Sequence, residues 1–482
     1  MKRLLRRVTL VTTEASFLTV MRAKPNLIFL ILLTGSHSQF SYATESIDST
    51  KEPLSVVMTL VDCIRRGLAN SPGLEVADYE REVVEKKLAE ARAAYFLPEI
   101  KLRILGGPVP DVPDGSGPDG NFPNVETKLS DFGPFIQARI EAIQPIFTFG
   151  KLSGLEEAAK KGVEAKKAQE RAVRNELIQR VKNIYNSLVY LYSLKDFLEE
   201  LQDRSRKARE KVEEQLRKHS PDVTEIDRMR LDVFFSETER RLIELRNGIH
   251  FGLSTMSILT GIPSVDIADK MLKMHQIEVR PLDYYLSRAK MGRPEIQQLA
   301  NAVRIKKALI KVSKADFFPT LFIGGFYGYG NAPGRQDVDN PFLKDDFNFN
   351  SGGVALGLEQ KLGFHLTNSR YEQAMSEYRQ VLAQEKLALQ GIEIQIRKTY
   401  SDVISKRDAA KSSENAFKAG RSWVLATTLN FGVGLVPVKD LLEAFVAYSK
   451  VKVGYLDIIY DSENAIAELS KVVGEEVSDL QY

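Results

Sequence analysis

Asn70-Ser71-Pro72-Gly73-Leu74 opens a helical segment in this 482-residue chain, and Gly292-Arg293-Pro294-Glu295-Ile296 opens a second one. The first segment ends before Pro98 and the second before Pro319. Each is followed by a strand-like run, a loop rich in Gly, Pro, Asp and Asn, another strand-like run and a very long charged helix. The opening prolines lie 222 positions apart and the closing ones 221 apart. This drifting offset predicts an internal duplication, with a first repeat in residues 44–290 and a second in 291–474.

The strand-like runs alternate apolar and polar side chains with a period of two. Runs of about 9–11 residues have the length of a bilayer-spanning strand, although a soluble sandwich strand alternates in the same way. The long polar loops 106–130 and 331–348 favour the membrane interpretation. We therefore expect the apolar face to meet lipid and the polar face to line a lumen. The expected lumen-facing residues are Lys101, Arg103, Gln137, Arg139, Glu141, Glu359 and Lys361.

Four strands in one chain are too few to close a barrel. An open sheet in lipid would leave unpaired backbone groups at its edges. Two chains would form an eight-stranded barrel that side chains fill, whereas three would form a twelve-stranded barrel with room for a lumen. The expected fold class is therefore an α+β membrane protein, a homotrimer with a 12-stranded β-barrel to which each chain contributes four strands.

Two long helices make up most of the remaining chain. Residues 151–218 and 368–430 contain no proline, and sixty-odd residues at 1.5 Å each extend roughly 100 Å. Apolar side chains recur in them, and in the last helix from Phe445 to Val473, at an average step near 3.5, which predicts coiled-coil seams. Short breaks at 218–222 and 431–437 should turn each helix back into an antiparallel partner.

The N-terminus carries the features of a secretory signal peptide in residues 1–43. Basic residues precede a short apolar core at 27–33, and Ser41-Tyr42-Ala43 has the small-x-small pattern of a cleavage site. Met21 is a plausible true start. The alternative, a membrane anchor, would need roughly 20 apolar residues, which this core lacks.

Composition argues against several function classes. The net charge of +3 is too small to favour nucleic acid as a partner. The five histidines are widely spaced and Cys63 is the only cysteine, so we expect no metal site and no cofactor. Cys63 follows a helical pattern and is expected to be a buried thiol. The glycines at 324–330 precede a polar loop and not a helix, which argues against dinucleotide binding. We therefore expect that the protein is not an enzyme. The alternative to a membrane channel is a periplasmic coiled-coil structural or adhesin-like protein without a pore.

The repeated order of helix starts, helix-to-strand entries and turns resembles that of the TolC-like outer-membrane efflux protein family. The resemblance covers about residues 54–473. It is carried by the helix start at Asn70-Ser71-Pro72-Gly73-Leu74, the helix-to-strand entries Leu97-Pro98-Glu99-Ile100 and Phe318-Pro319-Thr320-Leu321, the junction Gln144-Pro145-Ile146-Phe147-Thr148-Phe149-Gly150-Lys151 and the turn Phe431-Gly432-Val433-Gly434. Thr148 departs from the family, in which aspartate is frequent at this place.

This resemblance implies a trimer whose outer-membrane barrel continues into a long periplasmic α-helical coiled-coil barrel. It implies an exit duct for tripartite efflux or type I secretion, which works with a periplasmic adaptor protein and an inner-membrane pump. The expected location is the cell outer membrane, in contact with its lipid and with a large periplasmic extension. Exported substrate and pump class do not follow from the resemblance.

The resemblance also implies a periplasmic gate. Asp440 and Glu443 match the acidic rings of the family; they lie three apart on a helix and project to one side, so three copies would form a negative collar. The alternative is that Asp440 caps the last helix. The first turn lacks the glycines of the second, so the two turns should not move alike. The expected helix-turn and adaptor-contact region comprises Asp227, Gly432, Gly434 and Pro437, with Leu216 and Val436 as further contacts. Separately, residues 475–482 are expected to form a flexible tail.

Overall fold

The computed structural model divides the chain into two units, Met1–Glu52 and Pro53–Tyr482, and describes residues 55–110, 132–220, 223–275, 277–335 and 346–477. The expected signal peptide with Met21, the loop residues 111–130 and 336–345, and tail residues 478–482 lie outside the described residues. Among the helices that the structure describes, none is long and apolar enough to cross a membrane.

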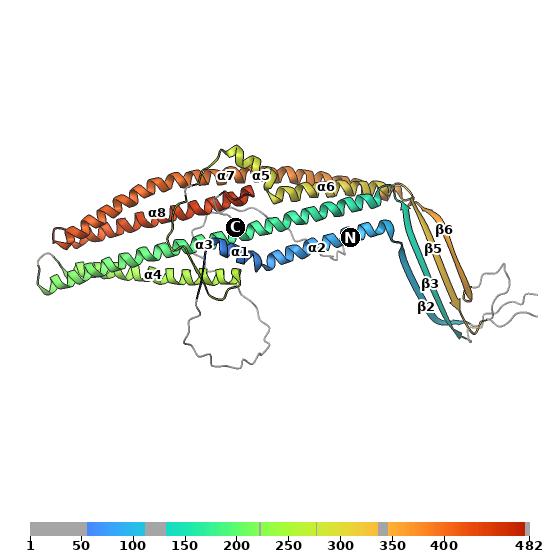
Figure 1. The fold of residues 1–482 in the computed structure, drawn as a ribbon, viewed down its shortest axis with the longest axis horizontal. Coiled ribbons are helices and arrows are strands. Elements are labelled where there is room, and N and C mark those ends of the chain that lie inside the picture. The colour runs from blue at the N-terminus through green and yellow to red at the C-terminus, as the bar shows by residue number, and fades with distance from the viewer. Residues whose placement is uncertain (1–54, 111–131, 221–222, 276, 336–345, 478–482) are drawn as a thin grey trace, which may run out of the picture. The chain divides into compact units, whose positions relative to one another are not determined.

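The second unit contains one series of elements that occurs twice (Figure 1). The first series is α1 (Leu60–Ala69), α2 (Pro72–Phe96), β2 (Glu99–Pro110), β3 (Phe132–Phe147), α3 (Lys151–Arg217) and α4 (Glu225–Thr260). The second is α5 (Leu282–Gly292), α6 (Pro294–Ala315), β5 (Thr320–Asn331), β6 (Phe349–Glu359), α7 (Phe364–Gly432) and α8 (Val438–Val473). Counted by elements, the second series begins at α5, so the expected boundary between residues 290 and 291 falls inside that helix.

Local signals explain where the helices begin and end. Ser71 is the N-cap of α2, and its side chain accepts a hydrogen bond from the Leu74 N–H at 3.3 Å, with Pro72 in the first turn. Pro294 occupies the same place in α6. Helix α2 ends at Phe96, and Leu97 is extended because a proline disfavours the helical conformation of the residue before it. Helix α6 ends at Ala315, four residues before Pro319. These positions are the ones that the duplicated sequence marks.

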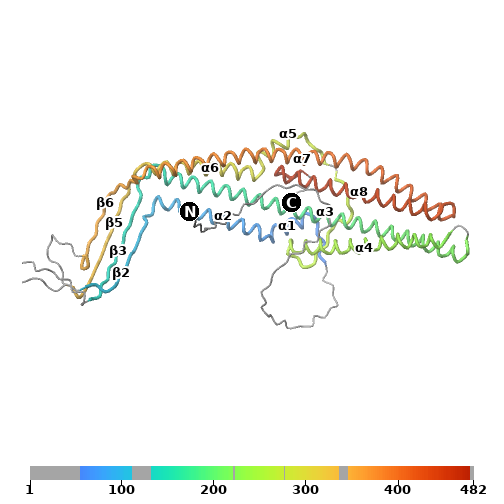
Figure 2. Tube along the Cα trace, turned by 180° about the vertical axis from the view of Figure 1, so that it is seen from behind, coloured from blue at the N-terminus to red at the C-terminus, as the bar shows by residue number. Residues whose placement is uncertain are grey.

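Helix α3 lies at the centre of the packing. It contacts α1, α2, α4, α6 and α8, while α7 packs along α8 and α6 (Figure 2). Most of the expected seam is buried: Val181 and Leu188 are fully enclosed, as are Phe445 and Leu469 in α8. In α7 the seam is less regular, since Ile396 is 1% exposed but Leu389 is 38% exposed. The coiled-coil core therefore depends mainly on α3 and α8.

A small second sheet braces the helices. Strands β1 (Val56–Met58) and β4 (Val265–Ile267) pair in parallel, and Met58, Val265 and Ile267 join the core cluster around α1, α3 and α8. Cys63 of α1 belongs to the same cluster and is fully buried. The expectation of a buried thiol is confirmed.

The main sheet has the strand order β2-β3-β5-β6, with every neighbouring pair antiparallel. Strand β2 continues to Pro110, five residues beyond the expected end, because Gly106–Pro110 still pairs with β3. Strand β6 ends at Glu359, so the expectation that Lys361 lies on it is wrong. Gln360 instead donates a hydrogen bond to the Phe317 carbonyl at 3.2 Å, in the link that leads to α7. Strands β2 and β6 are the two edges of the sheet.

The segment after α8 makes two ion pairs. The Glu475 carboxylate lies 2.5 Å from the Arg288 guanidinium of α5, and the Glu476 carboxylate lies 2.5 Å from the Lys182 ammonium of α3. Val477 packs on the cluster formed by α5, α7 and α8. The expected flexible tail therefore differs from the structure in its first three residues.

Candidate functional site

The main sheet separates charge from apolar surface. Its register places Lys101 opposite Glu141 and Arg103 opposite Arg139, and side chains alternate between faces along each strand. Every charged side chain of the four strands lies on one face, which includes Gln137 and Glu359. Of the seven residues expected to line a lumen, all but Lys361 share this polar face.

The opposite face is apolar and open to solvent in the single chain. Val354, Leu356 and Leu358 on β6 are between 66% and 76% exposed. An exposed apolar surface of this extent calls for a partner or a lipid environment. The apolar face comprises Ile100, Leu102, Ile104, Ile136, Ala138, Ile140, Ala142, Leu321, Ile323, Tyr327, Tyr329, Val354, Leu356 and Leu358. The same face also carries the uncharged polar residues Gln144, Asn331 and Asn350.

On the polar face, β5 and β6 carry phenylalanines that each lie directly opposite a glycine. Phe322 faces Gly357, Phe326 faces Gly353, and Phe349 faces Gly330. A β-carbon at Gly357 or Gly330 would overlap the facing ring. These rings extend over the neighbouring strand because the glycines leave the space for them.

The second helix turn is built on glycine. Helix α7 ends at Gly432, and Gly434 adopts a left-handed conformation with φ of 79°. The Leu435 N–H closes the turn by donating to the Asn430 carbonyl at 2.9 Å. Pro437 is the N-cap of α8 and fixes the backbone where the chain re-enters a helix.

Asp440 and Glu443 lie in the first two turns of α8, and both are exposed. Leu441, Ala444 and Phe445 on the other side of the helix are buried. The alternative that Asp440 caps α8 is wrong, because Pro437 holds that place and the helix has no side-chain cap bond. Among the described residues, neither carboxylate has a hydrogen-bond or ion-pair partner.

Asp227 occupies the corresponding place in the first turn but is engaged locally. Its carboxylate accepts hydrogen bonds from the Thr224 N–H at 3.1 Å and the Thr224 hydroxyl at 2.7 Å, and it pairs with Arg230 at 3.2 Å. Thr224 in turn caps α4, which completes a capping box. The two acidic positions are therefore equivalent in sequence and different in chemistry.

Sequence reasoning missed the contacts that join the two turns. The Lys211 ammonium donates a hydrogen bond to the Gly432 carbonyl and lies 5.7 Å from the Phe431 ring centroid. Leu216 is half-buried against the same core, which makes it a poor surface contact. The exposed apolar side chains of the turn are Val433 and Leu435, at 72% and 76%; Val436 is half-buried.

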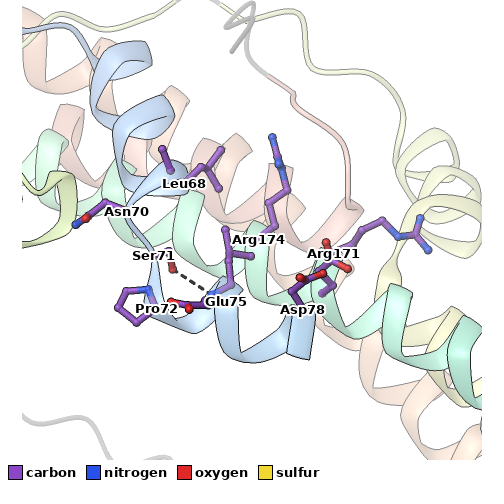
Figure 3. A pocket seen from close by; sticks show the side chains of 11 residues that line it. Leu68, Asn70, Ser71, Pro72, Glu75, Asp78, Arg171 and Arg174 are labelled. Atoms are coloured by element: carbon purple, nitrogen blue, oxygen red, sulfur yellow. Dashed lines mark hydrogen bonds between the residues drawn. The ribbon is translucent and has the colours of Figure 1, made fainter. Parts of the chain in front are cut away.

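The duplicated helix-start motif borders an open pocket between α2 and α3 (Figure 3). Its charged lining residues are Glu75 and Asp78 from α2 and Glu170, Arg171 and Arg174 from α3, so carboxylates outnumber guanidinium groups by three to two. Within the described residues, no group of three or more metal-ligating side chains comes together. The motif thus has a structural explanation: Asn70 donates to the carbonyls of Ile258 and Leu259 and holds α1 against α4.

Comparisons with known proteins agree with this architecture. No protein-family model matches the sequence. The chain is 23% identical to the alkaline protease secretion protein AprF of Pseudomonas aeruginosa over 419 residues, which is 82% of each protein. It is 23% identical to the outer membrane protein TolC of Escherichia coli over 232 residues, which is 46% of this chain and 41% of TolC.

Solved structures share the fold at low sequence identity. The outer-membrane channel OprN superposes with a TM-score of 0.70 and 16% identity, over 86% of this chain and 89% of OprN. The Campylobacter jejuni outer membrane channel CmeC superposes with a TM-score of 0.68 and 18% identity, over 92% of this chain and 96% of CmeC. The duplicated helix–sheet–helix series and these likenesses show that the chain has the fold of the TolC-like outer-membrane channels.

Proposed function

We propose that this protein is the outer-membrane exit duct of a tripartite efflux or type I secretion system. Three copies would form a passive channel in the outer membrane with a long periplasmic extension, and a periplasmic adaptor protein and an inner-membrane pump would deliver the substrate. The observation that carries the proposal is the two-faced sheet, whose charged side chains all lie opposite an exposed and predominantly apolar face that carries no charged residue.

The edges of the sheet support an oligomer. Within the part of the chain that the structure describes, strands β2 and β6 each have one side without a strand partner. Unpaired backbone groups in hydrocarbon cost several kcal/mol each, so a sheet in lipid must close on itself. Three copies supply twelve strands, which leaves a lumen lined by the polar face.

The relatives support the same class of function. The names of AprF and TolC describe a protease secretion protein and an outer membrane protein, and OprN and CmeC are described as outer-membrane channels. These are transport proteins, which favours a channel over an enzyme. The periplasmic structural or adhesin-like alternative accounts for the helices but gives no role to the exposed apolar face, so we do not favour it.

The tip of the α7–α8 pair is the proposed gate and docking region. Three copies of Asp440 and Glu443 around one axis would form a negative collar that favours cations. The exposed Val433 and Leu435, beside Gly434 and Pro437, would offer the adaptor an apolar contact next to this collar. Asp227 is already engaged by its helix cap and would not belong to the collar.

The first test is fractionation followed by electrical recording. A barrel protein should resist a salt wash of the membranes and require detergent for extraction, and it should run as a trimer. Reconstituted into planar bilayers, it should produce discrete conductance steps with a cation preference in a KCl gradient. Protein that leaves the membrane with salt alone would refute the channel.

A pair of variants locates the gate. Asp440→Asn with Glu443→Gln should lower the cation preference and favour the closed state, because the side chains no longer attract cations and the carboxylates no longer repel one another when the ring narrows. Asp227→Asn is the matched control; it alters the equivalent position of the first turn and should leave ion selectivity unchanged. Equal effects of the two changes would argue against a collar at Asp440.

A further inference from the structure

The polar face of the sheet contains an unusual cross-strand pair. Arg103 of β2 and Arg139 of β3 lie directly opposite each other in the register. Their β-carbons are therefore about 5 Å apart, a distance at which two like charges destabilise a sheet. Because this arrangement costs stability, we infer that the positive charge serves function and not folding.

The other charges of the two strands neutralise one another and leave Arg103 over. The Arg139 guanidinium pairs with Glu141 at 2.8 Å and lies 5.3 Å from the Phe326 ring centroid. Lys101 pairs with Glu99 at 3.0 Å. Among the residues that the structure describes, Arg103 has neither an ion-pair nor a hydrogen-bond partner.

Neighbouring strands bring no acid to this level of the sheet. The row that contains Arg103 and Arg139 continues through Gly328 of β5 and Ser351 of β6. The only charged residue of β6 is Glu359, at the end that adjoins the helices. Strand β2 begins at that same end, so Glu359 of a neighbouring copy would lie level with the start of β2, about 13 Å from Arg103 along the strand.

We propose that Arg103, beside Arg139, forms an anion-binding belt on the inner face of the channel. Three copies would place three uncompensated guanidinium groups at one level, where they would bind small polyvalent anions of the phosphate or carboxylate class. The belt is opposite in sign to the collar at Asp440 and lies at the other end of the duct. This inference rests on the proposed channel, because only there does the polar face enclose a lumen.

A binding measurement tests the belt whether or not the channel is open. The apparent Tm of the detergent-solubilised protein is measured in pyrophosphate and in chloride at matched ionic strength. Pyrophosphate should raise the Tm of the wild type, because a ligand of the folded state stabilises it, and Arg103→Gln should remove that rise. Lys101→Gln, a neighbour already paired with Glu99, is the control and should keep it. No rise in the wild type, or an equal rise in Arg103→Gln, would overturn the proposal.

Ion selectivity gives an independent readout. Three charges about 8 Å from a permeating ion, screened at 0.15 M salt, change the local concentration of each ion by about 2.5-fold. Arg103→Gln should thus raise the cation-to-anion permeability ratio by about sixfold, whereas Arg103→Lys should keep the wild-type ratio. An unchanged ratio in Arg103→Gln channels would refute the belt alone, while protein that never requires detergent would refute the channel itself.

Discussion

The ion pair between Lys182 and Glu476 links the end of the second repeat to the middle of the first. The Lys182 side chain is 4% exposed and Glu476 is 18% exposed. The Ser470 hydroxyl lies 3.1 Å from the other carboxylate oxygen of Glu476. Glu476→Gln preserves the shape of this side chain and removes its charge, so the buried Lys182 ammonium loses this carboxylate as a counter-ion.

The expected loss follows from this burial. Removing one partner of a buried pair costs about 3–5 kcal/mol, and the partial exposure of Glu476 favours the lower end of that range. The unfolding entropy of roughly 420 residues is about 0.9 kcal/mol/K. A loss of about 3 kcal/mol therefore corresponds to a fall of about 3 °C in the apparent Tm.

The adjacent pair is a matched control. Glu475 and Arg288 are equally close at 2.5 Å, but their side chains are 39% and 44% exposed. Exposed pairs contribute about 0–1 kcal/mol, so Glu475→Gln should lower the Tm by no more than about 1 °C. Differential scanning calorimetry in detergent makes the comparison. A loss in Glu475→Gln as large as that in Glu476→Gln would refute the reasoning from burial.

Three further outcomes are expected. Gly154→Ala should destabilise the protein by about 1–3 kcal/mol, because its β-carbon would lie 3.1 Å from a backbone oxygen of α6. Gly391→Ala is the control: its β-carbon would have no neighbouring atom within 4 Å, so this change should be neutral or stabilising in the same calorimetric scan. The hydrogen bond to Glu463 raises the pKa of His275 above its ordinary value of 6.5, so the wild type should be more stable than His275→Gln below pH 6.5, and this difference should vanish as the pH rises through the raised pKa. Burial raises the pKa of Cys63 to about 12, so maleimide at pH 8 should label it only after unfolding; rapid labelling of the folded protein would contradict the buried position.

The architecture could be predicted because its signals are local and occur twice. Prolines and caps mark the helix ends, the two-residue alternation marks the strands, and the step near 3.5 marks the seams. Element ends were harder to predict: Lys361 falls on the same two-residue spacing as Gly357 and Glu359, although Gln360 breaks the apolar half of the pattern and the strand stops at Glu359. Alternation reports side-chain pattern and carries no information on where backbone pairing stops.

The gate residues show a different limit. Asp227 and Asp440 correspond by their offset, yet the residue three positions earlier decides their chemistry. Thr224-x-x-Asp227 is a capping-box pattern visible in the sequence, whereas Pro437 has no side-chain acceptor to offer. The contacts of Lys211 with Gly432 and of Lys182 with Glu476 join residues more than two hundred positions apart, and no local pattern indicates them.

The phenylalanines that lie over glycines in β5 and β6 have a consequence for the width of the proposed duct. Each ring rests on the wall because its neighbour has no side chain. A methyl group at Gly357 or Gly330 would push the ring of Phe322 or Phe349 away from the sheet. In a trimer, three such rings would then project into the lumen. The width of the lumen would thus depend on the absence of side chains at these glycines. One added β-carbon per chain would narrow it.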